Sequence, residues 1–398
     1  MPSTLPAAPR EFSYLPLQRV IYGEGAVALA GQELERLGAR RALIVTGTTI
    51  STKTELLDRV RASLGNACAG VFDGVRQHVP RQAVLDGVVA AREARVDALV
   101  SLGGGSAIDC AKGIALVLAE GERWDECRMT FELPDTIRVP RLTRPKLPHL
   151  AIPTTLSGAE FTHIAGITRA DVGTKEIFLD PQLVPKAVVL DPTFTLATGP
   201  TLWASTGIKA LDHCVESVYS LKSAVFTDAL CLRAVRLLFE HLEASLARPD
   251  DLVPRLVLQQ ASWLACYGIT NTWVGLGHAL CHQVGAKCSV PHGVAAGILL
   301  PHAMAFNRPA TVERQALLAE AMGIAVGGSA EAAAAEAMRA VAGLVARLGL
   351  PARLRDVGIA ETVLEVIAEH TARDFVVYTN PRKIRDQQEI LDLLRRAW

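Results

Sequence analysis

Short apolar runs alternate with helical periodicity in the first half of this 398-residue chain. Four runs rich in Val, Ile, Leu and Ala, at 41–46, 96–102, 149–152 and 186–190, have the length of buried strands. Between the first two, residues 82–94 carry apolar side chains at helical spacing. Because a strand–helix–strand order implies right-handed crossovers, this half is expected to form a parallel sheet with helices around it.

The second half shows helical periodicity with few strand signals from Thr195 onward. The segments expected to be helical are 204–219, 226–246, 252–267, 274–284, 312–322, 330–348 and 359–370. Asp191 and Pro192 stand where the last apolar run ends, in a stretch punctuated by Pro and Thr. We therefore expect an α/β domain over residues 1–192 and an all-α domain over residues 193–398.

The composition is typical of a folded globular protein, since 50% of the residues are hydrophobic and 21% are charged. Lys plus Arg and Asp plus Glu both number 41, and a chain without net charge has no global attraction for nucleic acid or an anionic membrane. No apolar run approaches the roughly 18 residues that span a bilayer, and the first residues lack a signal-peptide pattern. The eight cysteines include no Cys-x-x-Cys pair and indicate reduced thiols. The sequence therefore predicts a cytoplasmic protein that acts on a small molecule.

A glycine-rich turn follows the second predicted strand and opens a helix. Its backbone amides could approach a pyrophosphate closely, and the helix N-terminus favours negative charge, although a tight structural turn would use the same glycines. After the next strand, Thr154, Thr155 and Ser157 could line the same crevice or serve as a turn and helix cap. The residues of the turn predicted to bind a dinucleotide are Gly104, Gly105, Ser106, Ala107, Ile108 and Asp109, which follow Gly103.

Histidines cluster in the helical half. His278, His282, His292 and His302 fall within 25 residues, and the first two are spaced to share a helical face. His213 lies elsewhere in the same half. Imidazole is both a metal ligand and an acid–base group, so the cluster indicates a catalytic or metal-related site, with helix packing as the alternative.

Four motifs taken together resemble the iron-containing alcohol dehydrogenase family. They are the segments Gly103–Asp109, Ile152–Thr155, Thr206–His213 and Gly277–Gly293. The resemblance implies a dehydroquinate synthase-like fold, with an N-terminal α/β dinucleotide-binding domain, a C-terminal helical catalytic domain and the active site in the cleft between them. It further implies hydride transfer with NADH or NADPH, and a homodimer.

The resemblance also bears on metal binding. Where this family binds a divalent metal, the ligands are one Asp and three His, and the matching positions here are Lys209, His213, His278 and His292. An ammonium has no lone pair to donate and repels a divalent cation, so we expect the metal to be absent. If a metal binds nevertheless, His213, His278 and His292 would hold it.

Three elements are similar to the maleylacetate reductase branch of the family. Besides the non-acidic residue at position 209, they are the short Thr154–Thr162 segment, the Gln77–Pro80 element with His78, and Tyr378–Arg382 near the end. This resemblance implies reduction of maleylacetate to 3-oxoadipate in aromatic-compound degradation. The connection at 121–148 is longer than that branch leads us to expect.

The site residues receive the following roles from this resemblance. Lys209, with His213 and His278, would replace the metal as the positive group that stabilises developing negative charge. His282 is the candidate proton donor and Tyr378 a second one. Gly47 stands where NAD-selective relatives carry Asp, so NADPH should be accepted along with NADH, and His78 and Lys175 are further candidate cofactor contacts.

Other functions remain open at this point. A reductase of small aldehydes or oxo acids, with or without a metal, would use the same motifs. A dehydroquinate synthase-like lyase shares the fold but needs a metal and more basic residues in the helical half. A binding protein that kept only the nucleotide site is disfavoured, because the four histidines at 213, 278, 282 and 292 occur together.

Overall fold

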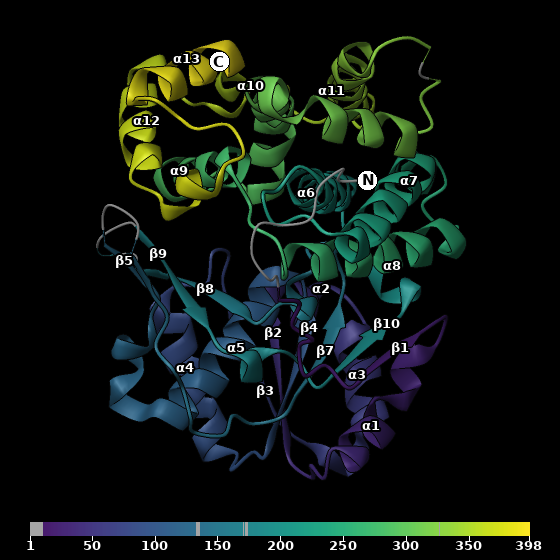
Figure 1. Ribbon diagram of the computed structural model, residues 1–398. Coiled ribbons are helices and arrows are strands. Elements are labelled where there is room, and N and C mark those ends of the chain that lie inside the picture. The colour runs from purple at the N-terminus through teal and green to yellow at the C-terminus, as the bar shows by residue number, and fades with distance from the viewer. Residues whose placement is uncertain (1–10, 133–135, 170, 172–173, 326) are drawn as a thin grey trace.

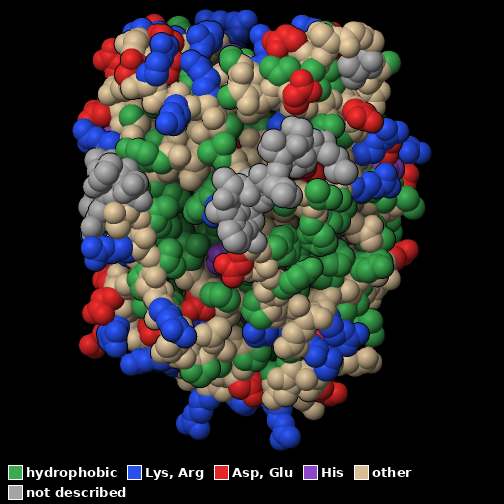
Figure 2. All heavy atoms as spheres, in the orientation of Figure 1, with side chains coloured by type: hydrophobic (Ala, Val, Ile, Leu, Met, Phe, Trp, Pro, Cys, Tyr) green, Lys and Arg blue, Asp and Glu red, His purple; other side chains and the backbone are tan. Residues whose placement is uncertain are grey.

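The computed structural model describes residues 11–132, 136–169, 171, 174–325 and 327–398. A parallel sheet with its helices forms one half of the molecule, and a helical half stands above it (Figure 1). The predicted fold class is confirmed. In the space-filling view, hydrophobic side chains gather across the middle of one face, and charged side chains gather at the two ends (Figure 2).

The main sheet has six strands, all parallel to their neighbours. In spatial order they are β1 (Arg19–Tyr22), β10 (Ala187–Leu190), β7 (His149–Pro153), β4 (Ala98–Gly103), β2 (Ala42–Gly47) and β3 (Cys68–Val75). The four strands predicted from apolar runs are all present. The two edge strands, β1 and β3, were not predicted, because their side chains are only partly buried and do not form a continuous apolar run.

Helices cover both faces of this sheet, and side chains alternate between the faces along each strand. Along β2, Ile44 packs with α1 (Ala30–Arg36) and α3 (Leu56–Leu64) on one face. Leu43 and Val45 pack on the other face, and the helices there are α4 (Arg81–Glu93) and α5 (Gly105–Glu120). The carboxyl ends of the strands point toward the helical half (Figure 1).

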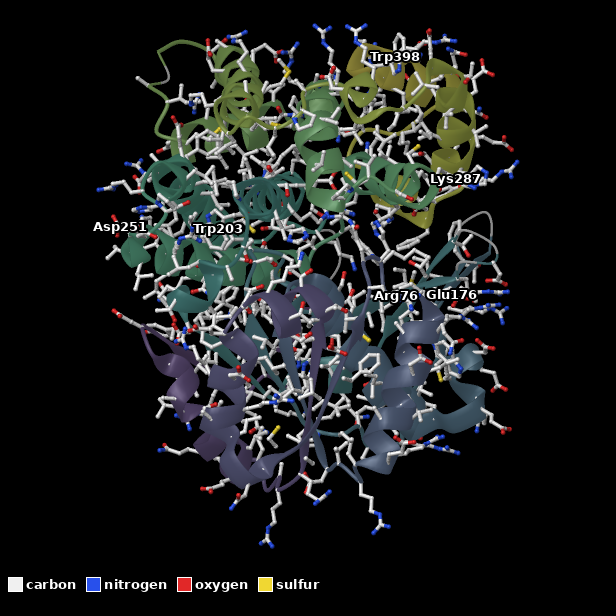
Figure 3. The ribbon with its side chains drawn as sticks, turned by 180° about the vertical axis from the view of Figure 1, so that it is seen from behind. Arg76, Glu176, Trp203, Asp251, Lys287 and Trp398 are labelled. Atoms are coloured by element: carbon white, nitrogen blue, oxygen red, sulfur yellow. The ribbon has the colours of Figure 1, made fainter. Side chains whose placement is uncertain are left out.

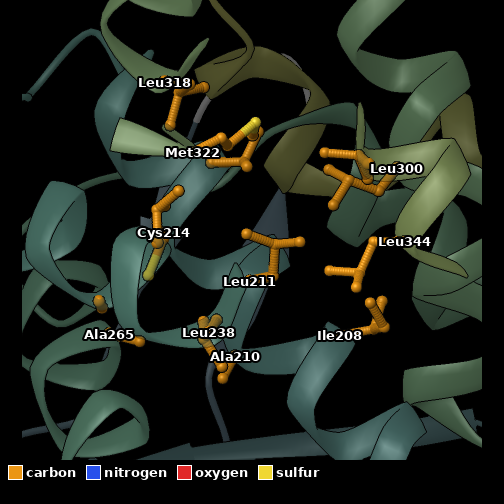
Figure 4. Close-up of a cluster of buried hydrophobic side chains, with 14 of the residues drawn as sticks. Ile208, Ala210, Leu211, Cys214, Leu238, Ala265, Leu300, Leu318, Met322 and Leu344 are labelled. Carbon is orange, nitrogen blue, oxygen red and sulfur yellow. The ribbon is translucent and has the colours of Figure 1, made fainter. Parts of the chain in front are cut away.

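The helical half is built around α6, whose buried side chains pack with those of the neighbouring helices in the core drawn in Figure 4. Its helices are α6 (Pro200–Val218), α7 (Val225–Ala247), α8 (Leu252–Ile269), α9 (Leu276–Cys288), α10 (His292–Ala321), α11 (Ala330–Arg347), α12 (Leu364–Ala372) and α13 (Gln387–Ala397). The helix predicted at 312–322 corresponds to the part of α10 after a kink at Thr311, where the backbone leaves helical geometry two residues after Pro309. The part of α10 before the kink, from His292 onward, was not predicted.

Two hairpins rise from the sheet half toward α9 and α12 (Figure 1). They are β8 (Ile164–Arg169) with β9 (Thr174–Leu179), and β5 (Thr130–Glu132) with β6 (Thr136–Arg138). The Met129 amide donates to the Ile177 carbonyl at 2.8 Å and joins the hairpins. Within the described parts of the chain, no helix is long and apolar enough to cross a membrane.

Candidate active site

The glycine turn forms a cradle at the carboxyl end of β4. Gly103 has a φ of 144°, which favours glycine, and α5 begins two residues later. A Cβ at Gly104 would lie 3.1 Å from Thr155 Cγ2, and one at Gly105 would lie 3.1 Å from Ser157 Oγ. Thr155 Oγ1 and Ser157 Oγ are buried and lack a hydrogen-bond partner among the described residues. Free hydroxyls beside the first amides of a helix fit the pyrophosphate of a dinucleotide.

The cradle lies where the sheet topology reverses. From β2 the chain moves outward to β3, then returns to β4 on the other side of β2 and continues to β7. In open parallel sheets, ligands bind at such a switch point. Gly47 ends β2 there, next to Asp73 of β3, whose carboxylate accepts a hydrogen bond from Ser51 at 2.8 Å. Sequence reasoning did not identify this acidic side chain.

Three predicted cofactor residues have their polar groups engaged within the protein. The amides of Ala107 and Ile108 donate to the Gly104 carbonyl, and the Ile108 side chain is fully buried. The Asp109 carboxylate accepts from the Gly166 amide at 3.2 Å. Ile108 thus offers no free polar group, and Asp109 joins α5 to β8. The assignment of cofactor contacts to these residues stays a prediction.

His78 and Lys175 approach the cleft from the β3–α4 connection and from β9. His78 has a φ of 62°, and its carbonyl accepts from Thr168 Oγ1 at 2.6 Å. Burial and the nearby Lys175 ammonium lower the pKa of His78, so its ring is neutral. The pKa of His292 is lowered mainly by burial and also by Lys175, which places this lysine on the side of the histidine cluster.

The structure brings four histidines together from three helices. The ring centroid of His278 lies 5.4 Å from that of His213 and 5.7 Å from that of His292. The ring centroids of His282 and His292 are 5.9 Å apart. α6 carries His213, α9 carries His278 and His282, and α10 begins with His292. Gly293 lets α10 approach α6, because a Cβ there would overlap the Ser205 carbonyl. The clustering predicted from sequence is thus observed.

Lys209 reaches into this cluster. Its Nζ lies 2.7 Å from His278 Nε2 and 3.2 Å from Asp212 Oδ2. The opposite nitrogen of His278, Nδ1, lies 2.5 Å from Glu216 Oε2, and Glu216 is itself held by the Gly275 amide at 3.0 Å. Burial lowers the pKa of His278 to about 3. A neutral ring that donates to Glu216 and accepts from the Lys209 ammonium satisfies both contacts.

Metal binding meets an obstacle at Lys209. Among the described residues, the donor atoms of Asp212, His278 and His292 lie within 4.8 Å of one another. This set differs from the predicted His213, His278 and His292, and Nδ1 of His213 lies 3.6 Å from Cys266 Sγ. The Lys209 ammonium contacts Asp212 and His278, two donors of this set, and its positive charge opposes a divalent cation there. Asp212 Oδ1 and His292 Nε2 are buried and have no hydrogen-bond partner within the described parts of the chain.

His282 lies at the outer side of the cluster and is paired with Asp374. Its Nδ1 is 3.1 Å from Asp374 Oδ2, and Asp374 also accepts from the Val376 amide at 3.1 Å. Burial alone would raise the pKa of Asp374, but the hydrogen bond and charge of His282 together with the Val376 amide lower it. The carboxylate therefore fixes the orientation of His282. Sequence reasoning missed Asp374, which is 92 residues away from its partner.

Tyr378 and His302 are placed differently from the cluster. Tyr378 lies in η9 (Phe375–Thr379), is 50% exposed, and its ring packs 5.5 Å from that of Phe131. Its role as a proton donor stays a prediction. The pKa of His302 is lowered by burial and by Arg396 of α13, which places it on another side of α10.

Comparison with known proteins identifies the family. Residues 17–192 match the sequence profile described as iron-containing alcohol dehydrogenase, and residues 203–398 match the C-terminal profile of the Fe-containing alcohol dehydrogenase family. The chain belongs to the iron-containing alcohol dehydrogenase family. This member is therefore an NAD(P)-dependent oxidoreductase. The domain boundary predicted near Pro192 stays a prediction, although the two matches leave it in the gap between them.

Relatives within the iron-containing alcohol dehydrogenase family have different names at similar identity. 1,3-Propanediol dehydrogenase of Citrobacter freundii is 33% identical, with 98% of this chain and 99% of that protein covered. Maleylacetate reductase 2 of Cupriavidus pinatubonensis is 34% identical, with 96% and 94% covered. Among solved structures, a 1,3-propanediol oxidoreductase superposes with a TM-score of 0.91 at 31% identity, covering 98% of this chain and all of that one. Maleylacetate reductase from Agrobacterium tumefaciens gives a TM-score of 0.80 at 29% identity, with 98% of both chains covered.

Proposed function

We propose that this enzyme reduces maleylacetate to 3-oxoadipate with NADH or NADPH and without a divalent metal. The observation that carries the proposal is the position of Lys209, whose Nζ lies 2.7 Å from His278 Nε2 and 3.2 Å from Asp212. A fixed ammonium is thereby available where the family uses a cation. The 34% identity to a maleylacetate reductase supports the choice of substrate.

The reduced nicotinamide, when bound, supplies the hydride that adds to the carbon–carbon double bond of the substrate. The electron pair of that bond moves to the conjugated carbonyl oxygen and gives an enolate, and Lys209 stabilises its negative charge. Glu216 and Asp212 position Lys209 and His278 for this task. One double bond is reduced and one NAD(P)H is oxidised.

A proton must then reach the enolate carbon. Burial lowers the pKa of His213 and His278, so these rings are neutral and poor proton donors. His282 is only partly buried, so it is open to the cleft, and its contact with Asp374 holds the ring in place. We assign the proton transfer to His282. The cofactor residues in this proposal are Gly104, Gly105, Ser106, Thr155 and Ser157, and the enzyme would act as a cytoplasmic homodimer in aromatic-compound degradation.

The test measures oxidation of NADH and NADPH by chelator-treated enzyme with maleylacetate as acceptor, together with the metal content of the sample. Rapid oxidation at negligible metal content is expected. Absence of oxidation, whether or not zinc or iron is added back, would refute the proposal.

A metal-dependent dehydrogenase or reductase of small alcohols, aldehydes or oxo acids is the second candidate. It is favoured by the proximity of Asp212, His278 and His292 donor atoms, within 4.8 Å of one another. Relatives named 1,3-propanediol dehydrogenase and lactaldehyde reductase are 33% and 32% identical. In this case, chelation should abolish activity toward 1,3-propanediol or lactaldehyde, and zinc or iron should restore it.

A further inference from the structure

A pocket of about 460 Å³ opens beside His282, at one end of the cleft. The β8–β9 and β5–β6 hairpins form one wall, and α9 with the α12–η9 connection forms the other. The proposed hydride and proton transfers involve only His282 and Asp374 of its lining, and they leave the outer part of the pocket unused. The charged and aromatic residues that line it are Arg128, Phe131, Arg169, Lys175, Glu176, His282, Lys287, His370, Arg373, Asp374 and Phe375.

Positive charge predominates in this lining. Its two carboxylates are already neutralised, since Glu176 pairs with Arg81 and, at 3.2 Å, with Arg128, and Asp374 pairs with His282 at 3.1 Å. Arg169 has a partner in Asp171 at 2.9 Å. The pocket therefore keeps uncompensated cations but no uncompensated anion of its own.

Two lysines line the pocket from opposite walls, Lys175 of β9 and Lys287 of α9. The ammonium of Lys175 lies over Gly166 and interacts with the buried Asp109 carboxylate, whereas Lys287 has no ion pair among the residues that the structure describes. Figure 3 shows Lys287 on the helical side above Glu176, the neighbour of Lys175 in β9. An unpaired ammonium at the opening of a pocket attracts an anion.

Geometry relates this charge to the reacting centre. Lys287 lies five residues after His282 on the same helix, which is about 7.5 Å along the axis and about 140° around it. Both residues nevertheless line the same pocket, so the long side chain of Lys287 brings its ammonium to that opening. One carboxylate would meet Lys287 while the reacting carbons stay near His282.

The long connection noted in the sequence at 121–148 contributes the cover of this pocket. It includes β5, whose Phe131 ring lies 6.1 Å from that of Phe375 and 5.5 Å from that of Tyr378, so that it bridges the two halves. Lys287 itself is exposed, so added salt should weaken its attraction for a carboxylate.

We propose that this pocket binds the remote carboxylate of an anionic substrate and that Lys287 is the residue that selects it. The inference rests on the proposed function, because it names the substrate class of the same site. It also predicts that neutral alcohols and aldehydes of equal length bind poorly.

The experiment measures binding of adipate, an unreactive six-carbon dicarboxylate, to the full-length enzyme saturated with NADP⁺ by isothermal titration calorimetry. Lys287→Gln should raise the adipate Kd about tenfold, Lys287→Glu should raise it further, and added salt should weaken binding to the unmutated protein. Arg339→Gln is the matched control, because it removes one exposed charge on α11, where Arg339 pairs only with its neighbour Glu336. Hexanoate and 1,6-hexanediol are the monoanionic and neutral comparison ligands.

The outcomes separate this inference from the proposed function. Adipate binding that depends on Lys287 supports the pocket even if maleylacetate is not reduced, in which case only the proposed function fails. If maleylacetate is reduced, Lys287→Gln should raise its KM about tenfold with kcat nearly unchanged. The inference is overturned if adipate does not bind, if it binds the Lys287 variants as well as the unmutated protein, or if 1,6-hexanediol binds equally well.

Discussion

Replacement of Lys209 by Met tests the central electrostatic argument. The change keeps much of the side-chain volume and removes the ammonium that lies 2.7 Å from His278 Nε2. A unit charge about 4 Å from a developing oxyanion stabilises it by about 4 kcal/mol at the effective dielectric of a protein site. The Lys209 side chain is 13% exposed, and screening through that opening reduces the figure to about 3 kcal/mol. Turnover should therefore fall roughly 10²-fold.

The assay is steady-state oxidation of NADPH with maleylacetate, with the cofactor Kd measured separately. The Kd should be unchanged, because the cradle at Gly104 and Gly105 lies on another element. Lys222→Met is the control, since Lys222 follows the same helix and only stacks over Trp273 at 4.3 Å. Thermal unfolding checks that each variant folds. A kcat for Lys209→Met within threefold of the unmutated enzyme would refute the reasoning.

Further predictions concern metal binding, the cofactor, the proton donor and stability. Lys209→Asp should bind zinc or iron, measured by metal analysis after dialysis, because the ammonium is removed and a further carboxylate joins Asp212, His278 and His292. A metal-free variant would contradict this. Gly104→Ala should raise the NADPH Kd about tenfold in a fluorescence titration, because a Cβ would crowd Thr155 in the cradle. The backbone itself should not lose stability, since the φ of −81° at position 104 suits alanine. An unchanged Kd would show that the cradle does not hold the cofactor. Asp374→Asn should lower kcat roughly tenfold, because His282 loses its carboxylate partner. The amide oxygen of the new Asn side chain can still accept from the Val376 amide and cap η9. Full activity would exclude Asp374 as a positioning residue. Burial raises the pKa of Glu160 from 4.5 to about 7, so its contribution to stability is present below pH 4.5 and is lost as the pH rises through about 7. Glu160→Gln should therefore flatten the dependence of Tm on pH between pH 5 and 8. An unchanged dependence would count against this.

The sequence was sufficient where local pattern and chain order determine structure. Apolar runs located the four central strands, because strands buried on both faces need continuous hydrophobic character. It was insufficient for the part of α10 before the kink at Thr311, where Pro301 indicates a break but lies inside the helix. Pro301 is accommodated by packing around α10, which overrides the local preference, and the bend at Thr311 follows Pro309.

Four of the histidines that cluster in the site were predictable from the sequence, but most of the carboxylates around them and the orientation of the side chains were not. Helical spacing could have identified Asp212 and Glu216, which share a face with Lys209 at three and seven residues. The direction of Lys209 depends on His278, 69 residues away, so no local pattern determines it. The same holds for Asp374, which meets His282 only through the packing of η9 against α9.

The position of β1 constrains the order in which the protein can fold. Arg19 of β1 pairs with Ala187 of β10, so the first strand of the chain forms the sheet edge with the last strand to be synthesised. Such a pairing has high sequence separation, and its loop-closure entropy must be overcome late in folding. During synthesis, β1 therefore has no partner until nearly all of the α/β half has emerged from the ribosome. Truncations that remove β10 should leave an unpaired N-terminal segment and an aggregation-prone nascent chain.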